Sequence, residues 1–440
     1  MKTALLLIAL ISFSYQESLI RKSRHSKHGE DCFSDSACEE GLHCKLNRCM
    51  TAFEMNNMKK LGLYEDNICS LVKKCKYKKV CVKHRCVEPN TVETSKAKAS
   101  KEIEEDVQLI FSGSIYLNKK PYMSGYKSDK TFNYDHLFKH ISKDIKSADL
   151  SVVDQQTVFY IDDKEDKRKV NEKRTPKELG DAIAKAGFNL VLHANALAYM
   201  YKDKGIYNTI NYWKENHPNI HHLGISSTES QSEKDYFIFN KNGIKIGIIN
   251  FNGIVVKNIP KNKKYMINTI EISKIQNCIG ELKKQTDFVI VCMNWGGQTY
   301  YSPNKLQIKM AKALIQNGAD LIIGNHPHYV QPVSYVRSEN GNKGLVFFSL
   351  GNLIYDNDKK KNTLGSLASI VISKGKGKAY ISSYNLIPTI NHHDESENEY
   401  TVYKLSDYSQ NLGLKTNKKF SMEKIKLACS GIFGAFAHCD

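Results

Sequence analysis

Two groups of four cysteines with the same spacing constrain the N-terminal part of this chain more tightly than any other sequence feature. Both groups follow the pattern C-x5-C-x5-C-x4-C, at Cys32, Cys38, Cys44 and Cys49 and again at Cys69, Cys75, Cys81 and Cys86. A pattern that recurs so closely indicates an internal duplication of one small unit. We define the units as module 1, residues 32–49, and module 2, residues 69–86.

Disulfide bonds explain this cysteine spacing better than zinc does. Zinc sites usually contain C-x2-C pairs, which set the angle between two metal ligands, and the spacings here are wider. A unit of this size has too small a core to fold unaided, so covalent bridges have to stabilise it. We therefore predict two disulfides within each module. Four cysteines allow three pairings, of which we favour first to third and second to fourth.

The N-terminus has the parts of a secretory signal peptide. Lys2 gives a basic start, the run from Ala4 to Phe13 is apolar, and the small side chain of Ser14 suits cleavage after it. This run is too short to span a bilayer, and no later run is long enough, so we expect no transmembrane anchor. Residues 1–14 therefore predict a secreted or extracellular protein, in a compartment where disulfides persist.

The formal net charge of +18 favours an anionic partner. Because a secreted chain rarely meets nucleic acid, we exclude that partner and expect an anionic glycan or an acidic polymer. Module 2 has no acidic residue between its first and last cysteine. Its cations are the predicted polyanion-binding residues: Lys73, Lys74, Lys76, Lys78, Lys79, Lys83 and Arg85. The alternative is a solvated basic face that binds nothing.

The rest of the chain has the pattern of an α/β or α+β domain. After a linker, residues 90–106, short apolar runs alternate with amphipathic stretches. We assign this large domain to residues 107–392 and treat residues 393–440 as a C-terminal extension. Asn242-Gly243, between two apolar runs, predicts a β-hairpin. Thr175-Pro176-Lys177-Glu178 predicts a helix start with a capping box.

The cysteines outside the modules receive separate predictions. Cys429 and Cys439 close a short loop in the C-terminal extension and are expected to pair with each other. Cys292 lies in a predicted buried strand and is expected to remain a free, unreactive thiol. Cys278 is left over on a predicted helix.

In domains of this class, functional side chains lie in loops at the carboxyl ends of strands. Among the loops that follow predicted strands, His326-Pro327-His328 is the most distinctive. Two imidazoles separated by one proline can project from one rigid turn toward one cation. The H-x-H pattern alone is a weak signal, and a structural pair with ordinary hydrogen bonds is an equal alternative.

The ordered set of strand-end loops resembles the CapA family, also called the poly-γ-glutamate capsule synthesis domain, over about residues 107–392. The segments that carry the resemblance are Gly324-Asn325-His326-Pro327-His328, Ser349-Leu350-Gly351-Asn352, Asn294-Trp295-Gly296 and Thr175-Pro176-Lys177-Glu178-Leu179-Gly180-Asp181. The resemblance implies a calcineurin-like metallophosphoesterase architecture. That architecture is a four-layer αββα sandwich with a two-metal site on the strand-end loops.

This chain departs from the family where the resemblance places the metals. Neutral or apolar side chains stand at the positions of the family's ligands: Ser114 for Asp, Gln156 for Glu, Ala196 and Leu197 for Asn and His, and Asn294 for His. Only His326 and His328 keep the identity that the family pattern has. A two-metal site needs anionic oxygens to balance the cations, and two histidines alone bind a single metal weakly. No catalytic residue and no cofactor are therefore expected.

Three functions remain open at this point. The first is a catalytically degenerate member that binds an anionic polymer outside the cell, and the loss of ligands favours it. The second is a metal-dependent hydrolase or transferase with a reduced site, which would hold a divalent metal through His326 and His328. The third is a structural or matrix component in which the cysteine modules carry the function.

Overall fold

The computed structural model describes the large domain almost completely and the modules in short pieces. The described residues are 105–161, 175–298, 300–356, 364–375, 377–394, 396–397, 399–416, 420–433, 437 and 439, and the strand segments 43–45, 48–50, 80–82 and 85–87. The predicted signal peptide and most residues of both modules lie outside these ranges. The chain divides into two compact units, residues 1–52 and 53–440, which are described separately.

Each cysteine module contains one short antiparallel hairpin. In module 1, β1 (His43–Lys45) pairs with β2 (Arg48–Met50), and Cys44 lies opposite Cys49. In module 2, β3 (Val80–Val82) pairs with β4 (Arg85–Val87), and Cys81 lies opposite Cys86. The duplication seen in the sequence therefore recurs in the backbone register, whereas the disulfide pairing in the modules stays a prediction.

Two mixed β-sheets form the centre of the large domain. The eight-stranded sheet has the order β18-β17-β16-β5-β6-β7-β8, with β15 also paired to β5, and the six-stranded sheet has the order β13-β14-β12-β11-β10-β9. In chain order the strands are β5 (Glu105–Ile115), β6 (Leu150–Gln155), β7 (Leu190–Leu192), β8 (His221–Leu223), β9 (Tyr236–Lys241), β10 (Ile244–Asn252), β11 (Phe288–Asn294), β12 (Leu321–Asn325), β13 (Val330–Arg337), β14 (Lys343–Leu350), β15 (Asn352–Ile354), β16 (Leu364–Lys374), β17 (Tyr380–Asp394) and β18 (Glu399–Lys404).

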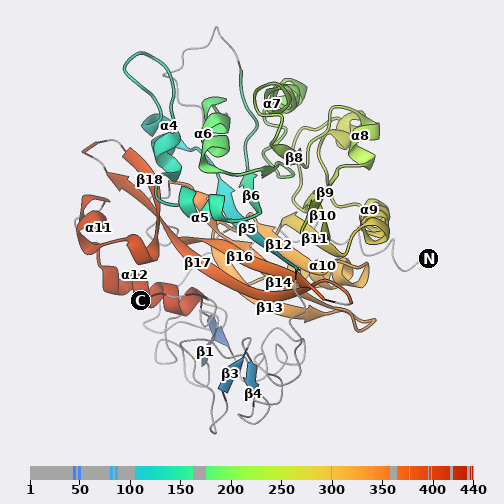
Figure 1. Cartoon of the computed structure of the whole chain (residues 1–440). Helices are drawn as coiled ribbons and strands as arrows, with labels where there is room; N and C mark the ends of the chain where they lie inside the picture. The colour runs from blue at the N-terminus through green and yellow to red at the C-terminus, as the bar shows by residue number, and fades with distance from the viewer. Residues whose placement is uncertain are drawn as a thin grey trace. The chain divides into compact units, whose positions relative to one another are not determined.

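Helices cover the outer faces of both sheets (Figure 1). The described helices of the domain are α4 (Lys119–Ser124), η3 (Asp135–Phe138), α5 (Ser142–Ser147), α6 (Glu178–Ala186), α7 (Lys202–Asn216), α8 (Glu229–Glu233), η4 (Lys261–Met266), α9 (Ile272–Gln285), α10 (Lys305–Gln316), η6 (Leu405–Asp407), α11 (Gln410–Thr416) and α12 (Met422–Phe433). Of these, α11 and α12 pack against the core between the sheets. None of these described helices combines the length and the apolar character needed to cross a membrane.

Buried side chains define the layers. One cluster fills the space between the sheets, with Leu109 of β5 and Ile248 of β10 among its members. A second packs the other face of the eight-stranded sheet under α4 to α7, where Trp213 of α7 is fully buried. A third packs the six-stranded sheet under α9 and α10 and includes Leu282 and Leu314. The order of layers is therefore helix, sheet, sheet, helix, which confirms the predicted αββα sandwich.

Local predictions from the sequence have mixed outcomes. The hairpin at Asn242-Gly243 is confirmed, because β9 and β10 pair antiparallel across it and both turn residues have positive φ. The capping box at Thr175 is wrong. Helix α6 begins at Glu178, and Lys177 stands at the N-cap without a side-chain bond. The Thr175 hydroxyl instead bonds the hydroxyl of Thr157, and the Thr175 carbonyl accepts from Tyr160 N.

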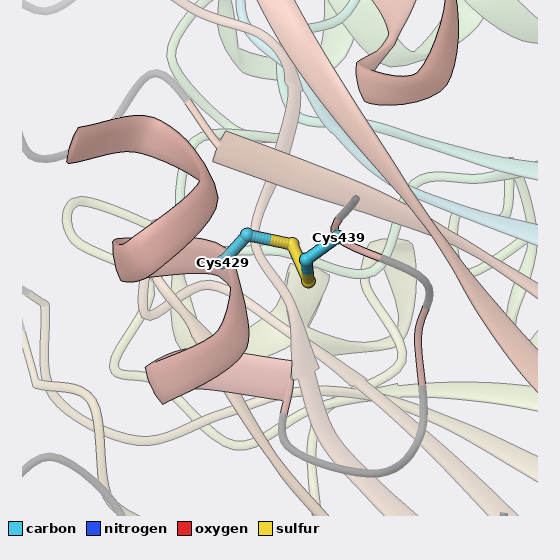
Figure 2. Close-up of a disulfide and its surroundings, with 2 residues drawn as sticks. All are labelled: Cys429 and Cys439. Atoms are coloured by element: carbon cyan, nitrogen blue, oxygen red, sulfur yellow. A yellow bond between two sulfur atoms is a disulfide. The ribbon is translucent and has the colours of Figure 1, made fainter. Parts of the chain in front are cut away.

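The C-terminal segment is part of the sandwich. The expected boundary at residue 392 falls inside β17, and β18 pairs with β17 beyond it. Cys429, Phe433 and Cys439 belong to the central core cluster between the sheets. Cys429 and Cys439 form a disulfide, as predicted (Figure 2). Residues 393–440 therefore complete the domain, and in the described part of the chain Cys278 and Cys292 are buried free thiols.

Candidate functional site at the carboxyl edge of the sheets

The parallel strands of both sheets bring the predicted loops together. In the eight-stranded sheet, Ser114 is the register partner of Asp154 on β6 and of Asn352 on β15. In the six-stranded sheet, Asn294 is the register partner of Asn325. The two edges meet where Asn325 Nδ2 donates to the carbonyl of Ser112, at 3.5 Å. Side chains from four separated loops therefore converge at one place.

Asp154 is the buried carboxyl group of this site. Its side chain is 2% exposed, and Ser114 Oγ donates to Asp154 Oδ2 at 2.5 Å. Burial raises the pKa of Asp154 to about 7, although hydrogen bonding from Ser114 and the nearby Gln156 side chain acts in the opposite direction. Burial outweighs the hydrogen bonds because no cation among the described residues pairs with the carboxylate, so the charged form is disfavoured.

His326 and His328 lie on a strained turn after β12. Both have positive φ, 97° and 64°, which is unusual for residues with a Cβ atom. Their ring centroids are 6.0 Å apart. Burial lowers the pKa of His326 to about 4, with His328 adding to the effect, and burial also lowers the pKa of His328. Both imidazoles are therefore neutral at pH 7.

The hydrogen bonds of His328 fix its tautomer. Asn352 Nδ2 donates to the carbonyl of His328 at 3.1 Å, so Asn352 Oδ1 faces the ring and accepts at 2.8 Å from Nδ1. Nδ1 thus carries the proton, and Nε2 keeps its lone pair. A carbonyl-type acceptor behind Nδ1 is the arrangement that orients histidine metal ligands. His328 can therefore act as a ligand through Nε2.

Asn294 and Asn325 are among the amide side chains of the site that have unsatisfied atoms. Asn294 is 1% exposed, and neither its Oδ1 nor its Nδ2 has a hydrogen-bond partner among the described residues. Asn325 Oδ1 is also without a partner, and Asn325 is 4% exposed. Buried polar atoms without partners are destabilising.

The third loop contributes no ligand atoms at its family positions. Ala196 and Leu197 follow β7, and Asn195 donates from Nδ2 to the Gln155 carbonyl at 3.1 Å. His193, which directly follows β7, is fully buried, and Trp213 Nε1 donates to its Nε2 at 3.1 Å. That histidine is therefore held in the core under α7.

The residues present do not fit two divalent cations. Such a pair needs several carboxylates, one of them bridging. The site has one carboxyl group, Asp154, and it is neutralised near pH 7 by burial. Among the described residues, no group of three or more His, Cys, Asp or Glu side chains could hold a metal ion. Neutral histidines and amides remain, and they can bind a single ion only weakly.

Close backbone packing explains the glycine of the Gly-Asn-His-Pro-His segment. A Cβ atom on Gly324 would lie 2.2 Å from the carbonyl oxygen of Phe348 and 2.4 Å from Trp295 Nε1. Trp295 is fully buried, and its Nε1 donates to that same carbonyl at 2.8 Å. The glycine therefore lets β12 approach β14, which seats the histidine turn against β15.

Three residues of the site were not assigned a role from the sequence: Asp154, Asn325 and Asn352. Asp154 precedes Gln156 by two residues in the same loop. Asp154 could have been recognised from the sequence as a candidate site residue, because an acidic residue at the end of an apolar strand is unusual. Asn325 and Asn352 gave no such signal, since asparagine is common in turns.

Comparisons with known proteins agree with this architecture. Residues 108–357, more than half of the 440-residue chain, match the family described as "Bacterial capsule synthesis protein PGA_cap". The capsule biosynthesis protein CapA of Bacillus anthracis is 26% identical over 233 residues, 51% of this chain and 55% of that protein. The PGA biosynthesis protein CapA of Bacillus subtilis (strain 168) is 26% identical over 215 residues, 48% of this chain and 55% of that protein. The chain thus spans about half the length of these curated relatives.

Solved structures that align with this chain include phosphoesterases. The calcineurin-like phosphoesterase YfkN from Bacillus subtilis aligns with a TM-score of 0.37 at 11% identity, covering 72% of this chain and 96% of that chain. A 5'-nucleotidase precursor from Thermus thermophilus aligns with a TM-score of 0.40 at 11% identity, covering 64% of this chain and 54% of that chain. By the extent of the family match, this chain belongs to the bacterial capsule synthesis protein family, as its strand-end motifs predicted.

Proposed function

We propose that this chain is a secreted, catalytically degenerate member of its family that binds an anionic polymer. The observation that carries the proposal is the composition of the strand-end site. One carboxyl group, Asp154, lies among neutral hydroxyl, amide and imidazole groups, and Ser114 already donates a hydrogen bond to it. Hydrolysis by a metal pair needs charge that these residues do not supply.

A reduced enzyme is the second candidate, and one observation favours it. His326 and His328 are held at positive φ, and backbone strain of this kind clusters at functional sites. If a single divalent metal binds, His328 Nε2 and His326 would hold it, with the Asn294 amide and Asn325 Oδ1 in the same site. Such a metal would supply Lewis acidity to a hydrolase or transferase.

The first prediction separates these candidates by metal binding. We expect no stoichiometric transition metal on the purified wild-type chain, and no metal-dependent phosphatase activity. We expect the double variant Ser114→Asp, Asn294→His to gain metal affinity. Asp at position 114 would stand beside Asp154, and two buried carboxylates repel unless a cation lies between them. The measurement is the melting temperature with Mn²⁺ or Zn²⁺ and after chelation.

The control for this prediction is a different substitution at position 114. Ser114→Asn keeps the size of the aspartate side chain but adds no charge, so its melting temperature should not respond to metal. Binding of a cation at 100 times its Kd stabilises a folded protein by about 2.7 kcal/mol. A wild-type chain that retains metal through dialysis, and hydrolyses phosphoesters only with it, would favour the reduced enzyme.

The polymer-binding part of the proposal rests on charge. The chain carries a net charge of +18, and module 2 is basic between its terminal cysteines. Disulfides would hold these cations in a fixed arrangement, so less conformational entropy is lost when they bind a polyanion. Poly-γ-glutamate, the polymer for which the family is named, is itself a polyanion, so its charge is opposite to the net charge of this chain.

The second prediction concerns module 2. Replacing Lys73, Lys74, Lys76, Lys78 and Lys79 together by alanine should lower the salt concentration at which the protein leaves a heparin matrix. Each exposed cation beside a polyanion contributes about 0.2–1 kcal/mol, and salt screens the contribution. The measurement is the elution salt on heparin. Elution of the wild type and the variant at the same salt would exclude module 2 as the binding site.

A further inference from the structure

We propose that the large domain carries its own binding surface for an acidic polysaccharide, formed by the lysine-rich loop after β10 and the start of α7. We call it the lysine surface and define it by Lys202, Lys257, Lys261 and Lys264. This inference rests on the proposed function, because it assigns a second site for the same class of ligand. It concerns residues that neither the cysteine modules nor the strand-end site include.

The loop is folded against α7 by a small core of its own. Val256, Ile259 and Tyr265 of the loop are partly buried against a cluster that contains Tyr199 and Ile206. Lys257, Lys261 and Lys264, which lie between these apolar residues, are exposed. Inward and outward side chains thus alternate, and the lysines are presented from a supported backbone.

Backbone bonds anchor the loop at both ends. Gly253 N donates to the Asn294 carbonyl at 2.7 Å, next to the strand-end site. At the other end, Ser226 N donates to the Met266 carbonyl at 3.1 Å, and Asn268 N donates to the Gly224 carbonyl at 3.0 Å. An ion pair between Lys263 and Asp203 joins the loop to the first turn of α7. The surface is therefore pre-organised, which reduces the entropy lost on binding.

The acid closest to this surface in sequence is already engaged. Asp203 pairs with Lys263 and also accepts from Tyr199 Oη at 2.6 Å, and these two bonds hold the pKa of Asp203 below its usual range. Lys202, Lys257, Lys261 and Lys264 form no ion pair with another described residue. Among the described residues, the other acids near these elements are Glu229 and Glu233 on α8, which packs on η4, and Glu271 at the end of the loop. Within the described part of the chain, the four lysines therefore keep charge that an external anion can bind.

The exposed aromatic and apolar side chains favour a polysaccharide over a membrane as the ligand of this surface. Tyr207 of α7 is 40% exposed, and its ring can lie against the face of a pyranose while lysines bind carboxylate or sulfate groups. A membrane-binding surface would need a larger apolar area. Among the described residues of this loop, Val255 is the exposed large hydrophobic side chain, at 82%. Single exposed apolar residues are ordinary on protein surfaces.

The test compares two fourfold variants of the full chain that change the net charge equally. The lysine-surface variant replaces Lys202, Lys257, Lys261 and Lys264 by Gln. The matched control replaces four exposed lysines on other helices or helix caps by Gln: Lys143, Lys177, Lys309 and Lys424. Affinity for soluble heparin is measured by titration at several salt concentrations. Poly-γ-glutamate and phosphatidylserine vesicles are measured in parallel, and thermal melting checks that each variant is folded.

We expect the lysine-surface variant to bind heparin about tenfold more weakly at 0.1 M salt, with a shallower dependence of log K on log salt, and the control to change less than twofold. Equal affinities of the two variants would overturn the inference. A loss confined to vesicles, or to poly-γ-glutamate, would overturn the assignment to a polysaccharide.

The module 2 variant distinguishes this inference from the proposed function. If only that variant loses heparin binding, the lysine surface is refuted and the proposed function stands. If only the lysine-surface variant loses binding, the inference holds and module 2 is excluded. A wild-type chain that binds none of the polymers refutes both.

Discussion

A chain truncated after residue 357, where the family match ends, is expected not to fold. The truncation removes β16, which lies between β5 and β17 in the eight-stranded sheet. Leu109 of β5 pairs with Ile370 of β16, and both are buried in the core between the sheets. Without β16, the central strand β5 would lose a complete row of hydrogen bonds and expose its apolar side chains.

The size of this effect follows from the number of buried groups removed. Each large apolar side chain that loses its burial costs about 1.5–3 kcal/mol. Domains are stable by only about 5–15 kcal/mol in total. Five such side chains, together worth about 8–15 kcal/mol, are as large as that whole margin. They are Leu367, Ile370, Ile372, Leu386 and Ile390, all fully or almost fully buried. The measurement is soluble expression and a cooperative thermal transition of residues 90–357 compared with residues 90–440.

A milder change in the same segment provides the control. The variant Cys429→Ser, Cys439→Ser keeps every strand and removes only the disulfide that closes a 10-residue separation. It is expected to fold and to lose about 2–3 kcal/mol, because the bridge restricts the unfolded chain. A cooperative transition for residues 90–357 at the temperature of the full domain would contradict the account.

The second large effect is the response of stability to pH in Asp154→Asn. The folded pKa of Asp154 is about 7, against a usual value of 3.8. Between these values the folded state binds the proton more tightly than the unfolded state, so the contribution of Asp154 is favourable at low pH and is lost as pH rises through 7. From pH 5 to pH 8 this loss amounts to about 2–3 kcal/mol. Asparagine does not titrate, so the unfolding free energy of Asp154→Asn does not include this loss.

The difference in unfolding free energy between wild type and Asp154→Asn, measured in urea at pH 5 and pH 8, isolates this group. Buried neutral histidines such as His193 and His326 titrate equally in both proteins, so their acid destabilisation cancels. Ser114→Ala serves as the matched variant. It removes the hydroxyl that stabilises the carboxylate and should move the transition to higher pH. A difference that does not change between pH 5 and pH 8 would show that Asp154 stays ionised.

Much of the fold was accessible from the sequence. The strands Leu190–Leu192 and Phe288–Asn294 follow apolar runs, and the hairpin at Asn242-Gly243 follows from turn chemistry. The helix start at Thr175 was misread because a local capping pattern competed with a tertiary bridge to Thr157. The extent of the domain was also hidden, since nothing in the composition of residues 393–440 reveals that Cys429 and Phe433 reach the central core.

The sequence predicted where the candidate site lies, but it did not predict all the residues that form it. The strand-end rule located Ser114, Asn294 and the two histidines, because parallel strands must end at a common edge. The pairing of Ser114 with Asp154 requires β5 and β6 to be neighbours in register, which a single sequence does not specify. The unsatisfied amide of Asn294 likewise depends on what surrounds it in three dimensions.

The position of β16 also governs the order in which this domain can assemble. During synthesis, β5 and β6 emerge early, but the strand that completes the other side of β5 is made only after the whole six-stranded sheet. Segments so far apart in the sequence pair slowly, because closing the long loop between them costs conformational entropy. The nascent chain therefore exposes an open, apolar edge of β5 until β16 has been made, and such edges favour aggregation.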